Sequence, residues 1–108
     1  MKVTTEDKAL YELITTGKTK ERKYRSLPPN VISGFLKAVN KFKVADSIES
    51  IKGDKGLHYE KLNGKLEGYE SVRLNIQYRL IFTSIVENGI TTITEVKLIK
   101  ISNHYGDL

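Results

Sequence analysis

The chain has 108 residues, a length that fits one domain over residues 1–108. Its formal net charge of +5 favours nucleic acid, or an acidic protein, as partner. The absence of cysteine excludes disulfides, thiolate nucleophiles and cysteine-ligated metal sites, and it is typical of a cytoplasmic protein. No apolar stretch approaches the roughly 20 residues of a membrane span, and the N-terminus lacks an apolar signal segment, so we expect no membrane partner.

The first half of the chain predicts two helices. Apolar residues recur at helical spacing over residues 5–16, with acidic residues in the first turn and Gly17 just past the end. A second helix is expected over residues 29–43, entered through prolines. Gly34 inside it indicates a close contact or a bend. Residues 45–50 predict a further helical turn.

The same half carries all of the net charge. Residues 1–56 hold twelve basic and seven acidic side chains, whereas residues 57–108 hold six of each. One run of positive charge is opposed only by Glu21; it consists of Lys18, Lys20, Arg22, Lys23, Arg25, Lys37, Lys41 and Lys43.

The second half predicts strands. Short β-rich runs are separated by turn residues, including Asn63-Gly64 and Asn88-Gly89, and they cover residues 57–62, 69–74, 78–86 and 90–101. Helices followed by consecutive hairpin strands indicate an α+β fold, in which the two helices pack on one face of a small twisted antiparallel β-sheet. The other face is then a candidate working surface.

The hairpin around residue 76 has a preferred register. Alternation places Leu74 on one face of its strand and Arg73 on the other. A loop of residues 75–77 pairs Leu74 with Tyr78 and Arg73 with Arg79, so that each face stays uniform. A two-residue loop would set Arg73 against Tyr78 and mix the faces, which a buried face resists.

Two arginines directly opposite each other on a sheet face repel, which indicates an anion between them. A phosphate suits the rigid, permanently charged forks of Arg73 and Arg79. The alternative is that each arginine pairs with Glu60, Glu70 or Glu95 as an ordinary exposed sheet residue.

Residues 57–82 and 101–105 together resemble the HigB toxins, which belong to the RelE/ParE superfamily of bacterial toxin–antitoxin systems. The similar motifs are a Leu-x-Gly-x-x-x-Gly turn from Leu62 to Gly68, the run Ser-Val-Arg-x-Asn, the run Tyr-Arg-Leu-Ile-Phe that ends at Phe82, and the terminal pair His104-Tyr105. The resemblance implies a RelE-like fold and a type II toxin. Its expected activity is that of a ribosome-dependent endoribonuclease that cuts mRNA in the ribosomal A site without metal or cofactor.

The resemblance also implies the site. Cleavage of RNA by its own 2′-hydroxyl group needs a base, an acid and cations that hold the charge building on phosphorus. Arg79 and Arg73 match the family's arginines and suit the charge role. His104 is the acid or base, with His58 as a reserve, and Tyr105 stacks on a base or donates a proton. Alternatively, His104 is a surface residue of the terminus and Tyr105 anchors the last strand.

Lys61 and Lys65 lie in the family's basic loop and are candidates for phosphate contacts, although surface lysines of a hairpin are more often simply solvated. Asn63 and Glu67 stand where many members have lysines. Two histidines 46 positions apart, without patterned carboxylates, predict no metal site.

The cationic run offers a docking surface for ribosomal RNA, through Lys18, Arg22, Arg25, Lys37 and Lys41. The same side chains are otherwise solvated helix faces or contacts for an acidic antitoxin segment. The resemblance implies a helix-turn-helix antitoxin of the HigA kind as partner, with operator DNA reached only through that antitoxin.

Two other functions are compatible with this scaffold. A ParE-like toxin would inhibit DNA gyrase without catalysis, and an inactive relative would only bind nucleic acid. The His104-Tyr105 pair favours the nuclease, because a purely protein-binding inhibitor needs no acid–base pair.

Overall fold

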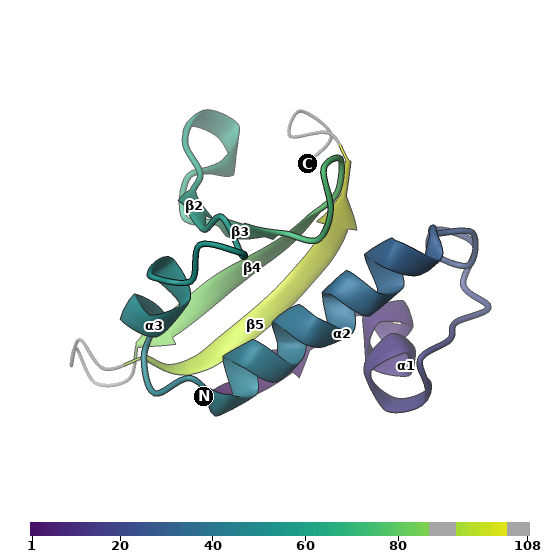
Figure 1. The fold of residues 1–108 in the computed structure, drawn as a ribbon, viewed down its shortest axis with the longest axis horizontal. Helices are drawn as coiled ribbons and strands as arrows, with labels where there is room; N and C mark the ends of the chain where they lie inside the picture. The colour runs from purple at the N-terminus through teal and green to yellow at the C-terminus, as the bar shows by residue number, and fades with distance from the viewer. Residues whose placement is uncertain (87–92, 104–108) are drawn as a thin grey trace.

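The structure is a computed structural model that describes residues 1–86 and 93–103 (Figure 1). The described elements follow in chain order: β1 (Lys2–Thr5), α1 (Lys8–Thr16), α2 (Pro29–Val44), α3 (Ile48–Lys52), β2 (Glu60–Lys61), the 3-10 turn η1 (Gly64–Leu66), β3 (Glu70–Arg73), β4 (Arg79–Val86) and β5 (Ile93–Ser102).

The sheet has the strand order β1-β5-β4-β3-β2, and β2 to β5 pair antiparallel as the sequence predicts. The helices α1 and α2 lie along one face of this sheet (Figure 1). The predicted α+β class is therefore confirmed. Strand β1 adds a parallel edge strand beside β5, which the sequence pattern does not predict.

The helix α1 begins three residues later than predicted because Thr5 belongs to β1. Asp7 caps the helix, and its carboxylate accepts a hydrogen bond of 3.0 Å from the N–H of Leu10. Gly17 ends the helix with a φ of 77°, a left-handed conformation that favours glycine. Helix α2 follows the prediction to within one residue at its end, and α3 begins three residues after the predicted start.

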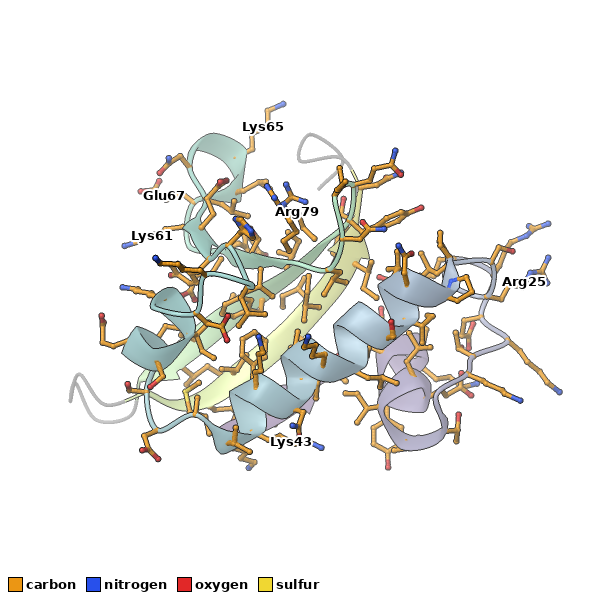
Figure 2. The ribbon with its side chains drawn as sticks, viewed as in Figure 1. Arg25, Lys43, Lys61, Lys65, Glu67 and Arg79 are labelled. Carbon is orange, nitrogen blue, oxygen red and sulfur yellow. The ribbon has the colours of Figure 1, made fainter. Side chains whose placement is uncertain are left out.

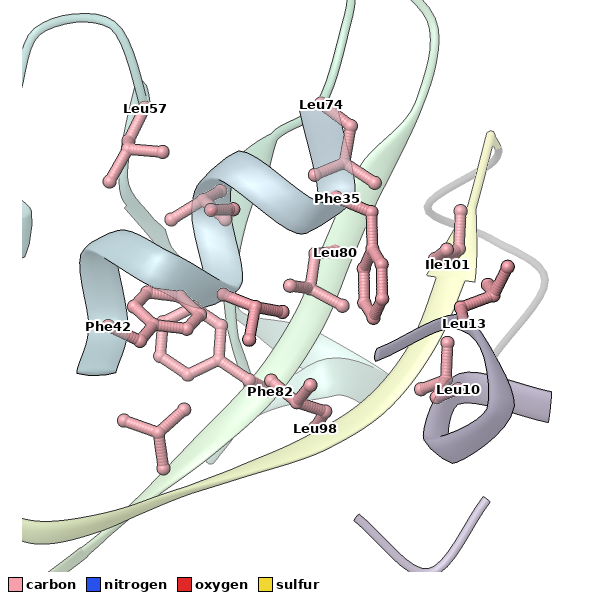
Figure 3. Packing of buried hydrophobic residues seen from close by; sticks show 14 of the residues in the cluster. Leu10, Leu13, Phe35, Phe42, Leu57, Leu74, Leu80, Phe82, Leu98 and Ile101 are labelled. Carbon is pink, nitrogen blue, oxygen red and sulfur yellow. The ribbon is translucent and has the colours of Figure 1, made fainter. Parts of the chain in front are cut away.

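The main core fills the space between the helices and the sheet (Figure 3). Leu10 of α1, Phe35 of α2 and Leu80 of β4 are completely buried in it. The ring centroids of Phe42 in α2 and Phe82 in β4 lie 4.9 Å apart. Alternate residues of β3 and β4 supply the sheet side of this core, as the hairpin register requires.

Gly34 explains how closely α2 approaches the sheet. A Cβ atom at this position would overlap the backbone carbonyl oxygen of Leu74, the residue directly after β3. The close contact that the sequence indicates at Gly34 is thus present, between two backbones.

Strand β2 is shorter than predicted. The sequence favours a strand over residues 57–62, but only Glu60–Lys61 pairs with β3. His58 has a φ of 46°, which interrupts extended backbone just before β2. The predicted turn at Asn63-Gly64 opens η1, and the Asn88-Gly89 turn lies outside the described residues.

A second, small core covers part of the opposite face of the sheet. It consists of Leu62, Leu66 and Ile81, with Tyr69 and Ile99 packed against it. The segment around η1 thereby covers part of the sheet face opposite the helices, the predicted working surface.

Candidate functional site

The predicted hairpin register is confirmed: Arg73 of β3 lies directly opposite Arg79 of β4. The loop of residues 75–77 is closed by a 2.9 Å hydrogen bond from the N–H of Leu74 to the carbonyl oxygen of Tyr78. The side-chain oxygen of Asn75 accepts hydrogen bonds from the backbone N–H groups of residues 77 and 78, at 2.9 and 2.7 Å. A short, internally braced loop therefore fixes both arginines on one face.

Arg79 is partly buried beside this loop. Its Nη1 donates to the carbonyl oxygens of Asn75, Ile76 and Tyr78 at 3.3 to 3.4 Å. In Figure 2, Arg79 lies between the η1 segment and the end of β5. The guanidinium group is thus held near backbone carbonyls at the rim of the sheet.

Arg73 is also partly buried, and its Nε is shielded from solvent without a hydrogen-bond partner among the described residues. The ion pairs within residues 1–86 and 93–103 include none that joins Arg73 to a carboxylate. Glu70 instead accepts hydrogen bonds from Tyr59 and Ser84, and Glu95 accepts one from Thr4. The alternative of a structural pair between Arg73 and one of these glutamates is not what the structure shows.

The end of β5 lies beside the arginine pair. Ser102 is the strand partner of Arg79, and it stands two residues before His104 in the sequence. His104 and Tyr105, the predicted acid–base pair, lie outside the described residues.

Glu60 is a further site candidate, which the sequence pattern indicates only as a partner for an arginine. It pairs with Ser71, and strand partners point to the same face, so Glu60 shares the face of Arg73. Its side chain is exposed, whereas the hydroxyl of Ser71 is buried without a partner among the described residues. Only the register of β2 against β3 identifies Glu60 as a site candidate, and a strand of two residues is too short for that register to be predicted from the sequence.

The candidates around the basic loop are dispersed. Lys65 lies on η1 and is exposed, and Lys61 is exposed on β2 (Figure 2). Lys61 pairs with Glu70, so it lies at the sheet edge on the helix side, away from the face of Arg73. His58 is exposed one residue after Leu57, whose carbonyl oxygen accepts the N–H of Arg73 at 2.7 Å.

The cationic run is separate from the arginine pair. Its first part is the loop between α1 and α2, and Figure 2 shows Arg25 of this loop beyond the start of α2, far from Arg79. Lys18, Arg22 and Lys37 are exposed. Lys41 forms a 2.8 Å ion pair with Asp54, and this hydrogen bond lowers the pKa of the Asp54 carboxyl group.

Among the described residues, no three histidine, cysteine, aspartate or glutamate side chains gather in a way that suits a metal ion. None of the helices within the described ranges combines the length and the apolar character that a membrane span requires.

Comparisons with known proteins agree with this architecture. The family model described as RelE-like toxin of type II toxin-antitoxin system HigB matches residues 4–96. Toxin HigB-1 of Vibrio cholerae is 29% identical over 62 residues, which are 57% of this chain and 65% of that relative. The chain therefore matches slightly less than two thirds of the length of this relative.

Solved toxin structures share the fold. The YoeB-YefM complex from Staphylococcus aureus contains a chain with a TM-score of 0.57 at 18% identity, covering 97% of this chain and 98% of that one. The YoeB/ParE toxin from Agrobacterium tumefaciens has a TM-score of 0.61 at 14% identity, covering 97% of this chain and all of that one. At such identities the likeness concerns the fold alone.

Proposed function

Because this chain belongs to the HigB-like family of RelE-like toxins of type II toxin–antitoxin systems, we propose that it is a ribosome-dependent endoribonuclease. It cuts messenger RNA in the ribosomal A site, in the cytoplasm. The nucleophile is the 2′-hydroxyl group of the RNA, which attacks the adjacent phosphate and releases the 5′-oxygen of the next nucleotide. No metal or cofactor takes part in this scheme.

The observation that carries the proposal is the pair Arg73 and Arg79 on one sheet face. Negative charge builds on the phosphate oxygens during the attack, and preorganised guanidinium groups stabilise that charge. The buried Nε of Arg73 has no partner among the described residues, so a donor is available for a phosphate oxygen. Like charges placed face to face are unfavourable in the empty site and favourable around an anion.

Two groups are available for proton transfer. Glu60 shares the face of Arg73 and suits the base that removes the proton of the 2′-hydroxyl group. His104 follows β5 by two residues and suits the acid that protonates the leaving oxygen, with Tyr105 stacking on a base or assisting as a donor. His58 is the reserve for either role.

Docking relies on the remaining cations. Lys65 and Lys61 lie at the edge of the sheet nearest η1 and contact the messenger backbone. The cationic run binds ribosomal RNA. Each phosphate contact releases counterions, so this binding depends on salt concentration. The surface that docks consists of Lys18, Arg22, Arg25, Lys37 and Lys41.

The partner that silences the toxin is an antitoxin, as in other type II systems. We assign it to the helix-turn-helix kind related to HigA, which also binds the operator DNA. Coexpression of the toxin with the product of a neighbouring helix-turn-helix gene tests this assignment, because the two proteins then copurify and growth resumes.

The central test is Arg79→Ala, measured by mapping mRNA ends after induction and in a translation extract. Loss of one preorganised donor to the transition state lowers the cleavage rate by roughly 10²- to 10³-fold. Lys55→Ala, which removes an exposed cation from the loop before β2, is the matched control and retains full cleavage. Unchanged cleavage by a folded Arg79→Ala protein contradicts the proposal.

The same assays separate the alternatives. A ParE-like toxin inhibits DNA supercoiling by gyrase and leaves mRNA intact. An inactive relative gives neither effect but still binds RNA. His104→Ala, compared with the wild type, distinguishes a nuclease from both, because only a nuclease loses mRNA cleavage when its acid is removed.

A further inference from the structure

A hollow lies at the edge of the sheet on the side opposite the arginine pair. It opens between α3 and β2 and has a volume of about 220 Å³, and the residues that line it include Ile48, Lys52, Tyr59, Lys61, Gly68 and Glu70. This volume is below the range of roughly 300 to 1,000 Å³ that is usual for drug-sized ligands. The hollow therefore suits one small planar group rather than a large molecule.

The carboxylate of Glu70 is held rigidly in this hollow. Tyr59 donates to its Oε1 and Ser84 donates to its Oε2, both at 2.6 Å. Burial, together with the hydrogen bond to Glu70, raises the pKa of Tyr59, so its hydroxyl group stays protonated and donates. A carboxylate has about four lone-pair sites and two are used, so it can accept further N–H donors from a ligand.

The walls of the hollow combine an aromatic ring and cations. Tyr59 is partly buried and supplies aromatic surface at the wall of the hollow. The ammonium group of Lys52 lies 5.6 Å from the centre of the Tyr59 ring, and Lys61 is exposed on the other side of the opening. An aromatic wall, an acceptor and two flanking cations match a base, its N–H donors and its phosphates.

We propose that this hollow binds one nucleotide of the RNA substrate and selects a base that carries an exocyclic amine. The base packs beside Tyr59 and donates N–H groups to Glu70, while the neighbouring phosphates contact Lys52 and Lys61. Lys61 lies on β2 at the edge of the sheet, between this hollow and the arginine face. The RNA strand therefore crosses the sheet edge at β2 to reach from one face to the other. This inference rests on the proposed function, because it names part of the same substrate.

Nucleotide binding is tested directly, without ribosomes. Amide NMR spectra of the labelled full chain are recorded with the 5′-monophosphates of guanosine, adenosine, cytidine and uridine, and with a short single-stranded RNA. We expect saturable shifts at Lys52, Gly68 and Glu70, weakest for uridine, whose base has no exocyclic amine. The RNA binds more tightly than any mononucleotide, because it adds phosphate contacts.

Two variants sharpen the test. Lys52→Gln weakens binding several-fold, whereas the matched control Lys55→Gln does not. Glu70→Gln removes the anionic acceptor and weakens binding of the amine-bearing bases by roughly tenfold, to the level of uridine. Lys52→Gln sits on the exposed side of α3, so it keeps the test valid if Glu70→Gln fails to fold.

The inference is overturned if no nucleotide gives saturable shifts at the hollow, if Lys52→Gln binds like Lys55→Gln, or if uridine binds as well as the others. A mononucleotide that binds as tightly as the RNA also overturns it, because the hollow is then a site for a free nucleotide. Arg79→Ala separates the two proposals: we expect this variant to lose mRNA cleavage and to keep the nucleotide shifts.

Discussion

The two faces of the sheet differ in what covers them and in what they carry. One face packs against α1 and α2 over a continuous apolar core. On the other face the described residues form a core of three buried side chains, and the arginine pair lies beside it. Because neighbouring residues of a strand point to opposite faces, the residues that hold the fold and those proposed for chemistry alternate along the same strands. Stability and activity are therefore separable by single substitutions.

The largest effect is expected on the helix-covered face. Phe82→Ala removes a completely buried ring that packs against Phe42, and deletions of this kind destabilise proteins by about 3 to 5 kcal/mol. Urea denaturation followed by circular dichroism measures the change in the free energy of unfolding. A loss below about 1 kcal/mol would show that this core is not the main source of stability.

A smaller loss is expected from the cover of the opposite face. Leu66→Ala removes the side chain of η1 that packs against Ile81, at a cost of about 2 kcal/mol, the low end for buried leucines. Leu66 keeps 8% of its surface exposed and its neighbours are few, which favours that low value. If Leu66→Ala lowers the free energy of unfolding as much as Phe82→Ala in the same urea titration, the two faces contribute equally to stability. The proposed difference between the faces is then wrong.

The arginine face gives a change of the opposite sign. Arg73→Leu removes a repulsion with Arg79 and a buried Nε without a described partner, so we expect the free energy of unfolding to rise by up to about 1 kcal/mol. If the proposed function is correct, the same variant loses messenger cleavage. A clear loss of stability in urea would mean that Arg73 has a structural partner and is not reserved for an anion.

The smallest effect concerns alkaline pH. Burial raises the pKa of Tyr24 and of Tyr59 above the ordinary value of 10.0. The folded chain therefore keeps protons that the unfolded chain loses, so stability is complete below about pH 10 and decreases as the pH rises above it. Tyr59→Phe has one such group fewer, and its urea stability should decline less steeply than that of the wild type between about pH 9 and pH 11. Equal slopes would contradict this assignment.

Much of this architecture is predictable from local patterns. The hairpin register follows from alternation alone, because a slip by one residue would expose Leu74 and Leu80. The helices follow from apolar spacing. Strand β1 was missed because it is short and half polar, and because its partner β5 lies more than 90 residues away in the chain. Pairing over such a distance leaves no trace in a local pattern.

The site was predictable in part for the same reason. Arg73 and Arg79 belong to one hairpin and could be placed together, whereas Glu60 joins them only through the pairing of β2 with β3. Lys61 was predicted to lie in the same basic loop as Lys65, but its register places it toward the helix side. His58, two residues before β2, has a positive φ that its residue type does not predict.

The contact between Gly34 and the carbonyl group of Leu74 sets a fixed spacing between helix and hairpin. Two backbones touch there, with no side chain between them to bend or change rotamer. Lys37 follows one turn later on the same helix, and Arg73 directly precedes Leu74. A side chain larger than hydrogen at residue 34 would therefore push α2 away from the hairpin, and it would shift the proposed docking cations of α2 relative to the arginine pair.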